Sequence, residues 1–216
     1  MNNFLNRLKS SPVGILGFSI IIIVFFLSIF SEIISPYDPN QYNLRMRYIP
    51  PFWISGDLNF ILGTDQLGRD MLSRLIYGTR ISVIVGIGGV IVSMVIGVFI
   101  GLICGFYRGI IDAILSRIID TLMSIPFILL AISIVGMVGI SGNDSLIVII
   151  IVLGLTGWIT FARVIRAEVL SIREKEYVES AYALGQTNFL IIIKHILPNV
   201  IPYIIVLSTL QIATVI

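Results

Sequence analysis

The residue types that carry most enzyme chemistry are scarce in this chain of 216 residues. It has one histidine, His195, and one cysteine, Cys104, so a two-histidine zinc-protease motif, a cysteine metal cluster and an internal disulfide are all excluded. None of the three lysines, Lys9, Lys175 and Lys194, follows a glycine, so the chain has no Gly-Lys-Ser/Thr phosphate-binding loop. We expect Cys104 to be a small buried residue and His195 to be a polar residue at a helix end. These residues predict a protein that is not an enzyme and binds no metal or cofactor itself.

The composition indicates that the elements positioning these residues lie in a membrane. Apolar residues make up 57% of the chain and charged residues only 12%, about half the usual charged fraction of a soluble domain. Helical membrane crossings need about 20 apolar residues each. Five stretches meet or approach that length: Val13–Ile34, Ile81–Cys104, Ile119–Ile140, Leu146–Ala162 and Asn199–Ile216. We therefore predict an all-α integral membrane protein with five transmembrane helices.

The distribution of basic residues predicts the orientation of these helices. If the N-terminus is cytoplasmic, nine Lys and Arg residues fall on the inner side and five in the outer loop, which favours that arrangement. The first apolar run is too long for a signal peptide and is expected to remain as an anchor. The chain is then divided into residues 1–34 (N-terminus and first span), 35–80 (outer loop) and 81–216 (remaining spans). The last span reaches Ile216 without a charged residue, so we expect the sequence to be cut short and a sixth span to be missing.

The second span carries a stripe of small residues at every fourth position. On a helix these residues form one smooth face on which another helix packs closely; a pore-lining role is the alternative. The stripe consists of Gly89, Ser93, Gly97, Gly101 and Gly105. Pro126 is expected to kink or begin the third span. The interior of the spans lacks the ionisable residues of proton-coupled pumps and voltage sensors, so uphill transport would draw its energy from another chain.

Residues 171–198 form the most informative loop on the predicted cytoplasmic side. Ser171 and Glu174 fit a capping box that would start a short helix, and Gly185 would end it. Thr187 or Asn188 would cap a second helix, and Pro198 would lead into the last span. This pattern predicts a helix-turn-helix along the membrane surface with the shape of a docking element.

The outer loop predicts a second local element. Thr64 or Asp65 is expected to cap a short amphipathic helix. Its apolar face would turn Leu67, Met71, Leu75 and Ile76 to the membrane, and its polar face would turn Arg69, Asp70 and Arg74 to water. A direct role in solute binding is the alternative to this structural one.

Two motifs resemble those of a known family. Glu179-Ser180-Ala181, Gly185 and His195-Ile196-Leu197-Pro198 resemble the EAA loop of ATP-binding-cassette (ABC) importer permeases, with Ser180 and His195 replacing the usual alanine and isoleucine. Gly63 to Asp70, with Gly68 and Arg69 inside it, and Ser73 to Arg80 resemble the outer-loop signature of the dipeptide, oligopeptide and nickel branch. Ser11 to Gly14 and Pro36 to Pro39 are similar to its C-type subunit.

This resemblance implies a function and partners. It implies the type I permease fold, with six spans in the full protein, in a multi-pass subunit of the cytoplasmic membrane that imports short peptides. Glu179, Ala181, Gly185, His195, Leu197 and Pro198 would belong to the loop that docks on the ATPase. The partners would be a second permease, two cytoplasmic ATPases that bind the ATP, an external solute-binding protein and the lipid bilayer, with no nucleic acid. Import of nickel or another small solute, or a passive channel or assembly factor, are the alternatives.

Overall fold

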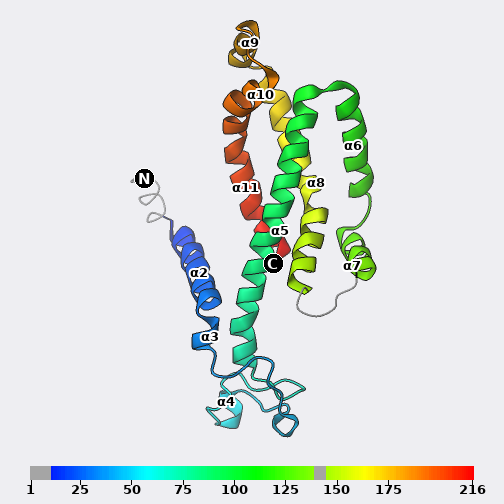
Figure 1. Ribbon diagram of the computed structural model, residues 1–216. Helices are drawn as coiled ribbons and strands as arrows, with labels where there is room; N and C mark the ends of the chain where they lie inside the picture. The colour runs from blue at the N-terminus through cyan, green and yellow to red at the C-terminus, as the bar shows by residue number, and fades with distance from the viewer. Residues whose placement is uncertain (1–10, 139–144) are drawn as a thin grey trace. The chain divides into compact units, whose positions relative to one another are not determined.

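The computed structural model describes residues 11–138 and 145–216, which fold into helices joined by short turns and one longer loop. The chain divides into two compact units, residues 1–84 and 85–216. Helix α5 (Met71–Tyr107) begins in the first unit and continues into the second. Among the described residues, four helices are long and apolar enough to cross a membrane, and a bent helix pair provides up to one more (Figure 1). The prediction of an all-α membrane protein is confirmed.

The first unit contains the N-terminal span and the 35–80 loop. Helix α2 (Pro12–Ile29) begins at Ser11, whose Oγ accepts a hydrogen bond from the backbone N–H of Gly14 at 3.2 Å. Pro12 occupies the first helical turn, where its missing N–H costs nothing. The short helix α3 (Ser31–Ile34) follows, so the expected first span is two helices that meet at Phe30. The loop contains the short helices η1 (Leu44–Met46) and α4 (Phe52–Ser55), and from Met71 onward it is the start of α5.

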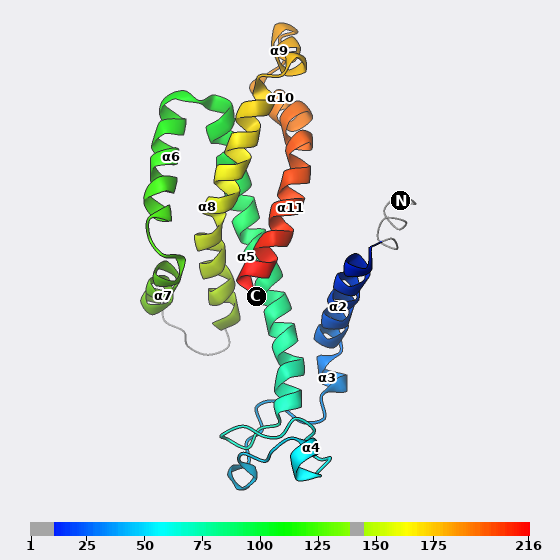
Figure 2. The ribbon, with the colours of Figure 1, turned by 180° about the vertical axis from the view of Figure 1, so that it is seen from behind.

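The second unit has α5 and α8 (Ser145–Arg173) at its centre. Figures 1 and 2 show α6 (Gly109–Met123) and α7 (Phe127–Val138) on one side of this pair and α11 (Leu197–Val215) on the other. At one end lie α9 (Glu176–Ala183), α10 (Asn188–Ile191) and the π-helical turn η3 (Ile192–Ile196). Helix α8 contacts α6, α7, α9, η3 and α11, so it is the hub of the unit.

The stripe of small residues on α5 lies against α8 throughout its length. A Cβ atom added at Gly97 would stand 2.4 Å from the carbonyl oxygen of Trp158, and one at Gly101 would stand 2.8 Å from that of Ala162. Gly89 and Gly105 face Leu153 and Val169 in the same way, and the Ser93 hydroxyl donates to the carbonyl of Gly154 at 3.2 Å. The distances at Gly97, Gly101 and Gly105 leave no room for a larger side chain, so these residues set the close approach of the two backbones.

Several helices extend beyond the predicted spans, and α8 ends at Arg173 instead of Ala162. The third span is a pair of helices, α6 and α7, bent by 94°, and α6 begins at Gly109 instead of Ile119. The break falls at Ser124–Pro126, where Pro126 lacks the N–H needed to continue a helix. Helix α5 starts at Met71, ten residues before the apolar stretch that begins at Ile81. The last helical stretch starts at Asn188, before the predicted Asn199, because α10, η3 and α11 form one continuous stretch of 28 residues. The expected end of the third span, at residues 139 and 140, lies outside the described residues.

Candidate functional site

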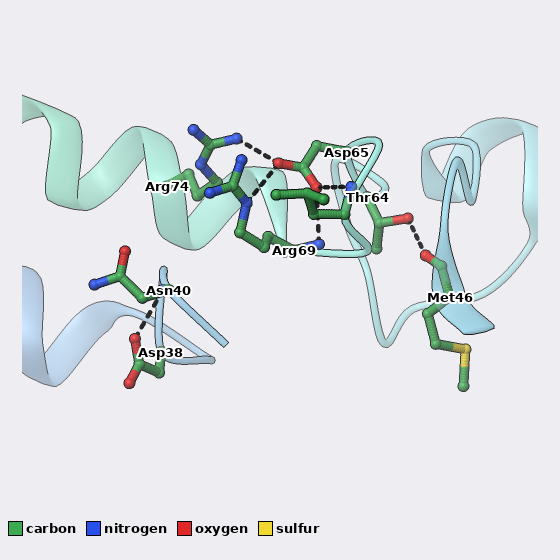
Figure 3. Close-up of polar contacts among 8 residues, drawn as sticks. Asp38, Asn40, Met46, Thr64, Asp65, Arg69 and Arg74 are labelled. Atoms are coloured by element: carbon green, nitrogen blue, oxygen red, sulfur yellow. Dashed lines mark hydrogen bonds and ion pairs between the residues drawn. The ribbon is translucent and has the colours of Figure 1, made fainter. Parts of the chain in front are cut away.

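Asp65 is the centre of a polar cluster in the 35–80 loop (Figure 3). Its carboxylate accepts hydrogen bonds from the backbone N–H groups of Leu67 at 2.8 Å and Arg69 at 3.0 Å. It also accepts from the guanidinium groups of Arg69 at 2.8 Å and Arg74 at 2.5 Å. Burial acts to raise the pKa of Asp65, but the hydrogen bonds from Arg69 and Leu67 outweigh it and lower the pKa to about 2. Four donors use the lone pairs of this carboxylate, which leaves none for a solute.

Two glycines fix the path of the chain on either side of Asp65. Gly63 and Gly68 have φ angles of +76° and +72°, in the left-handed region that favours glycine. Their backbones also touch other parts of the loop: an added Cβ would lie 2.3 Å from the carbonyl oxygen of Ile49 and 1.8 Å from that of Asn43. Both positions therefore require glycine, and the segment between them folds as a tight turn.

Asp70, at the end of this turn, caps helix α5. Its carboxylate accepts from the backbone N–H of Ser73 at 2.7 Å and from the Ser73 hydroxyl at 2.6 Å. The same hydroxyl accepts from the N–H of Tyr37 at 3.0 Å, which ties the start of the loop to its end. The predicted helix capped by Thr64 or Asp65 is wrong: residues 64–70 are not helical, and the helix begins at Met71. Asp70 was expected to face water but is buried.

Thr64 completes the loop. Its hydroxyl donates to the carbonyl of Met46 (Figure 3). The same hydroxyl accepts from the backbone N–H of Ile49 at 2.9 Å. Thr64 and Asp70 also form an isolated antiparallel bridge. These contacts lie within the loop, which favours the structural interpretation of the signature residues over direct contact with a solute.

The 171–198 loop is a second candidate site, built on the end of α8. Helix α8 continues to Arg173, whose guanidinium donates to the carbonyl of Phe106 at 2.6 Å and lies 5.6 Å above its ring. The predicted capping box at Ser171 and Glu174 is wrong, because Ser171 lies inside α8 and buried Ile172 extends the packed face of that helix. Lys175 occupies the N-cap position of α9 without a side-chain hydrogen bond.

Helix α9 ends in a complete Schellman motif at Gly185. The N–H of Gln186 donates to the carbonyl of Ala181 at 3.1 Å, and that of Gly185 donates to Tyr182 at 2.9 Å. Gly185 has a φ of +76°, as the turn predicted from the sequence requires. Thr187 occupies the expected N-cap position of α10, again without a side-chain hydrogen bond.

The EAA-like residues divide into a buried and an exposed set. Ala181, together with Val178, is buried in a core shared with α8, η3 and α11, whereas Glu179 is exposed. His195 is half-buried in η3, with Nε2 3.0 Å from Oε1 of Gln186. Leu197 is half-buried and Pro198 is exposed at the start of α11. The loop is thus a short helix fixed to two spans and open on its outer face.

Sequence reasoning missed a set of ion pairs between α6 and α8. Arg166 binds Asp112 through two hydrogen bonds, at 2.5 and 2.7 Å, and Arg163 binds Asp120 at 2.6 Å. The signal was present, because two acidic residues eight positions apart share a face of α6 opposite basic residues three apart on α8. These pairs link α6 to α8.

Two family models match the chain. Residues 97–216 match the family described as binding-protein-dependent transport system inner membrane component. Residues 1–51 match the N-terminal transmembrane domain of oligopeptide transport permease C.

Individual relatives align over nearly the whole chain. The oligopeptide permease OppC of Bacillus subtilis is 36% identical over 210 residues, which cover 97% of this chain and 66% of the relative. The dipeptide permease DppC of the same organism is 36% identical, with 95% and 62% covered. The dipeptide permease DppC of Haemophilus influenzae is 34% identical, with 96% and 70% covered. The chain spans slightly less than two thirds of the length of both Bacillus relatives. It belongs to the family of inner-membrane components of binding-protein-dependent transport systems, in the branch of the C-type peptide permeases.

Proposed function

We propose that this chain is the transmembrane permease subunit of an importer that moves short peptides across the cytoplasmic membrane. ATP hydrolysed by two partner ATPases drives the transport, and the chain itself performs no catalysis. A second, related permease completes the pathway, and an external solute-binding protein delivers the peptide. The N-terminus and the 171–198 loop lie in the cytoplasm.

The observation that carries the proposal is the attachment of α9. Its inner face, formed by Val178 and Ala181, belongs to the same buried core as Ile165 and Val169 of α8 and Val200 of α11. Glu179, on the outer face of α9, is exposed, and Leu184, which directly follows the helix, is 80% exposed. A force on the exposed face therefore reaches two spans through packed side chains, as a coupling element between an ATPase and a membrane domain requires.

The names of the relatives support peptides as the transported solute. The aligned proteins are named as oligopeptide, dipeptide and glutathione permeases, and these substrates share peptide or peptide-like amide groups. Nickel was an alternative from the sequence motifs. The described residues contain no group of three His, Cys, Asp or Glu side chains able to hold a metal ion, which adds no support for that alternative.

Purification of the tagged, full-length gene product from native membranes tests the proposal. We expect mass spectrometry to find a P-loop ATPase and a second permease in the complex. Uptake of labelled dipeptides, compared with uptake of nickel in the same cells, then identifies the cargo. Recovery of this chain alone, under conditions that keep a known ABC importer intact, would contradict the importer assignment and favour a channel or an assembly factor.

A further inference from the structure

A pocket of about 250 Å³ lies where the bent helix pair breaks beside α8. Ile125 and Pro126 of the break line it on one side, and Thr156 and Thr160 of α8 line it on the other. Ser124, Pro126 and Thr160 are exposed, and Ile125 is 42% exposed. The break therefore opens onto the surface of the unit, on the side of α8 away from α11 (Figures 1 and 2).

Packing against α5 places this pocket well inside the bilayer. Phe161, which follows Thr160, lies against Gly97 of α5. Gly97 lies within the uninterrupted apolar stretch Ile81–Cys104, seven residues from one end and sixteen from the other. At 1.5 Å per residue these separations correspond to roughly 10 Å and roughly 24 Å along the helix. The break at Ser124–Pro126 is therefore at hydrocarbon depth.

Exposed non-helical backbone at this depth does not face lipid. The helical hydrogen bonds of α6 end with Ser124 and Ile125, whose N–H groups donate to Thr121 and Leu122 at 3.2 Å. They restart only at Pro126, whose carbonyl accepts from Leu129. Hydrocarbon offers no partner for the backbone groups in between, so such a break persists only where protein covers it or where it lines a water-filled cavity.

We propose that the break at Ser124–Pro126, with Thr160 opposite, lines the water-filled path of the transported peptide and binds its amide groups. This inference rests on the proposed importer function and assigns residues of this chain to the path. The lining carries apolar groups and hydroxyl groups. The hydroxyl groups can form hydrogen bonds with the N–H and C=O groups of peptide bonds. Thr160 supplies an exposed hydroxyl in the lining itself. Ser124 precedes the lining residue Ile125; its Oγ donates to the carbonyl of Thr121 at 2.6 Å and keeps its own lone pairs for a peptide N–H.

The charges nearest the break are already paired. Asp120 lies one turn before Ser124, Arg163 lies one turn after Thr160, and the two form an ion pair at 2.6 Å. A neutral, hydroxyl-lined opening holds peptides of different side chains weakly and similarly. Weak binding is what a path requires, because the solute must also leave it.

Cysteine labelling of the complete transporter in lipid nanodiscs tests the inference. The native cysteine is first removed by Cys104→Ala, and Ser124→Cys and Thr160→Cys are then made separately. Phe99→Cys is the matched control, because Phe99 is two residues from Gly97, at the same depth, and 64% exposed on another face. The Cys104→Ala parent and the Phe99→Cys control are first required to show ATP-dependent dipeptide uptake, so that a failure of the importer function is recognised separately. A charged maleimide is the probe, since a thiol reacts rapidly only where water allows it to ionise.

We expect the cysteines at positions 124 and 160 to react at least about tenfold faster than the control, because a thiol in hydrocarbon stays protonated. A saturating dipeptide should slow both reactions several-fold, whereas the corresponding free amino acids should not. Rates as slow as that of the control, both at rest and with ATP hydrolysis trapped, would overturn the proposal. Fast labelling that the dipeptide leaves unchanged would also overturn it, because the break would then be wet but off the path.

Discussion

Replacement of Gly185 by valine provides the most direct test of the coupling-loop interpretation. Gly185 closes the Schellman motif of α9 at a φ of +76°, and a Cβ added there would meet no atom within 4 Å. The cost of a side chain at this position is therefore conformational and not steric against neighbours. A non-glycine residue in the left-handed region costs about 1–3 kcal/mol, with β-branched residues at the upper end. A factor of ten in an equilibrium corresponds to about 1.4 kcal/mol, so the docked loop conformation should become roughly 5- to 150-fold less populated.

The assay compares membrane insertion, ATPase association and peptide uptake in the same preparation. Gly185→Val should insert normally but recover less ATPase in a pull-down and transport less. Gly185→Asn should retain most of both activities, because asparagine tolerates a positive φ. Gly78→Val is the matched control, since Gly78 also has open space around it but lies within α5 at an ordinary φ. Equal ATPase recovery and uptake in Gly185→Val and the parent protein would refute the reasoning.

Four further substitutions test the packing and the polar clusters. Gly101→Val should lower the free energy of unfolding in detergent by about 1–3 kcal/mol, because its Cβ would lie 2.8 Å from α8. A loss of stability no greater than that of Gly78→Val would contradict the close packing. Asp112→Ala should lower the free energy of unfolding by about 1.5–3 kcal/mol, and Asp120→Ala should lower it by less than about 1 kcal/mol. The reason is burial, since the side chain of Asp112 is 15% exposed and that of Asp120 is 65% exposed. Equal losses in the two variants would argue against this difference. Asp65→Asn should speed proteolysis of the 35–80 loop near neutral pH. Folding lowers the pKa of Asp65 from 3.8 to about 2. The ionised carboxylate therefore stabilises the folded loop fully above pH 3.8, and this stabilisation is lost as the pH falls through about 2. At that pH the variant and the parent should be cleaved at the same rate. A difference that persists unchanged at that pH would show that the charge is not its source.

The spans and the loop turn were predictable because they depend on local sequence. A run of apolar residues commits a segment to a helix in the bilayer, and a proline such as Pro126 interrupts it wherever it stands. Gly185 was predictable for the same reason, since a glycine after a short amphipathic segment is a typical helix end.

The errors arose where distant contacts override local signals. The capping box at Ser171 is overruled by Ile172, whose burial against the core extends α8 to Arg173, two residues beyond the predicted N-cap. The predicted helix at residues 64–70 fails because Gly68 packs against the backbone of Asn43, twenty-five residues earlier in the chain. A single sequence does not show that contact, although a second glycine five positions after Gly63 was a hint of a turn.

Because Ile192–Ile196 form a π-helical turn, the number of residues in this segment matters for docking as well as their types. A π turn holds one residue more than an α-helical turn, and this surplus sets the rotation of α10 relative to α11. Loss of one residue here would let the helix run through regularly but would turn α10 by about 100° about its axis. Ile191, now fully buried, would then leave the core to which α9 is fixed. Homologous chains that keep this docking arrangement are therefore expected to tolerate substitutions in this turn far better than insertions or deletions.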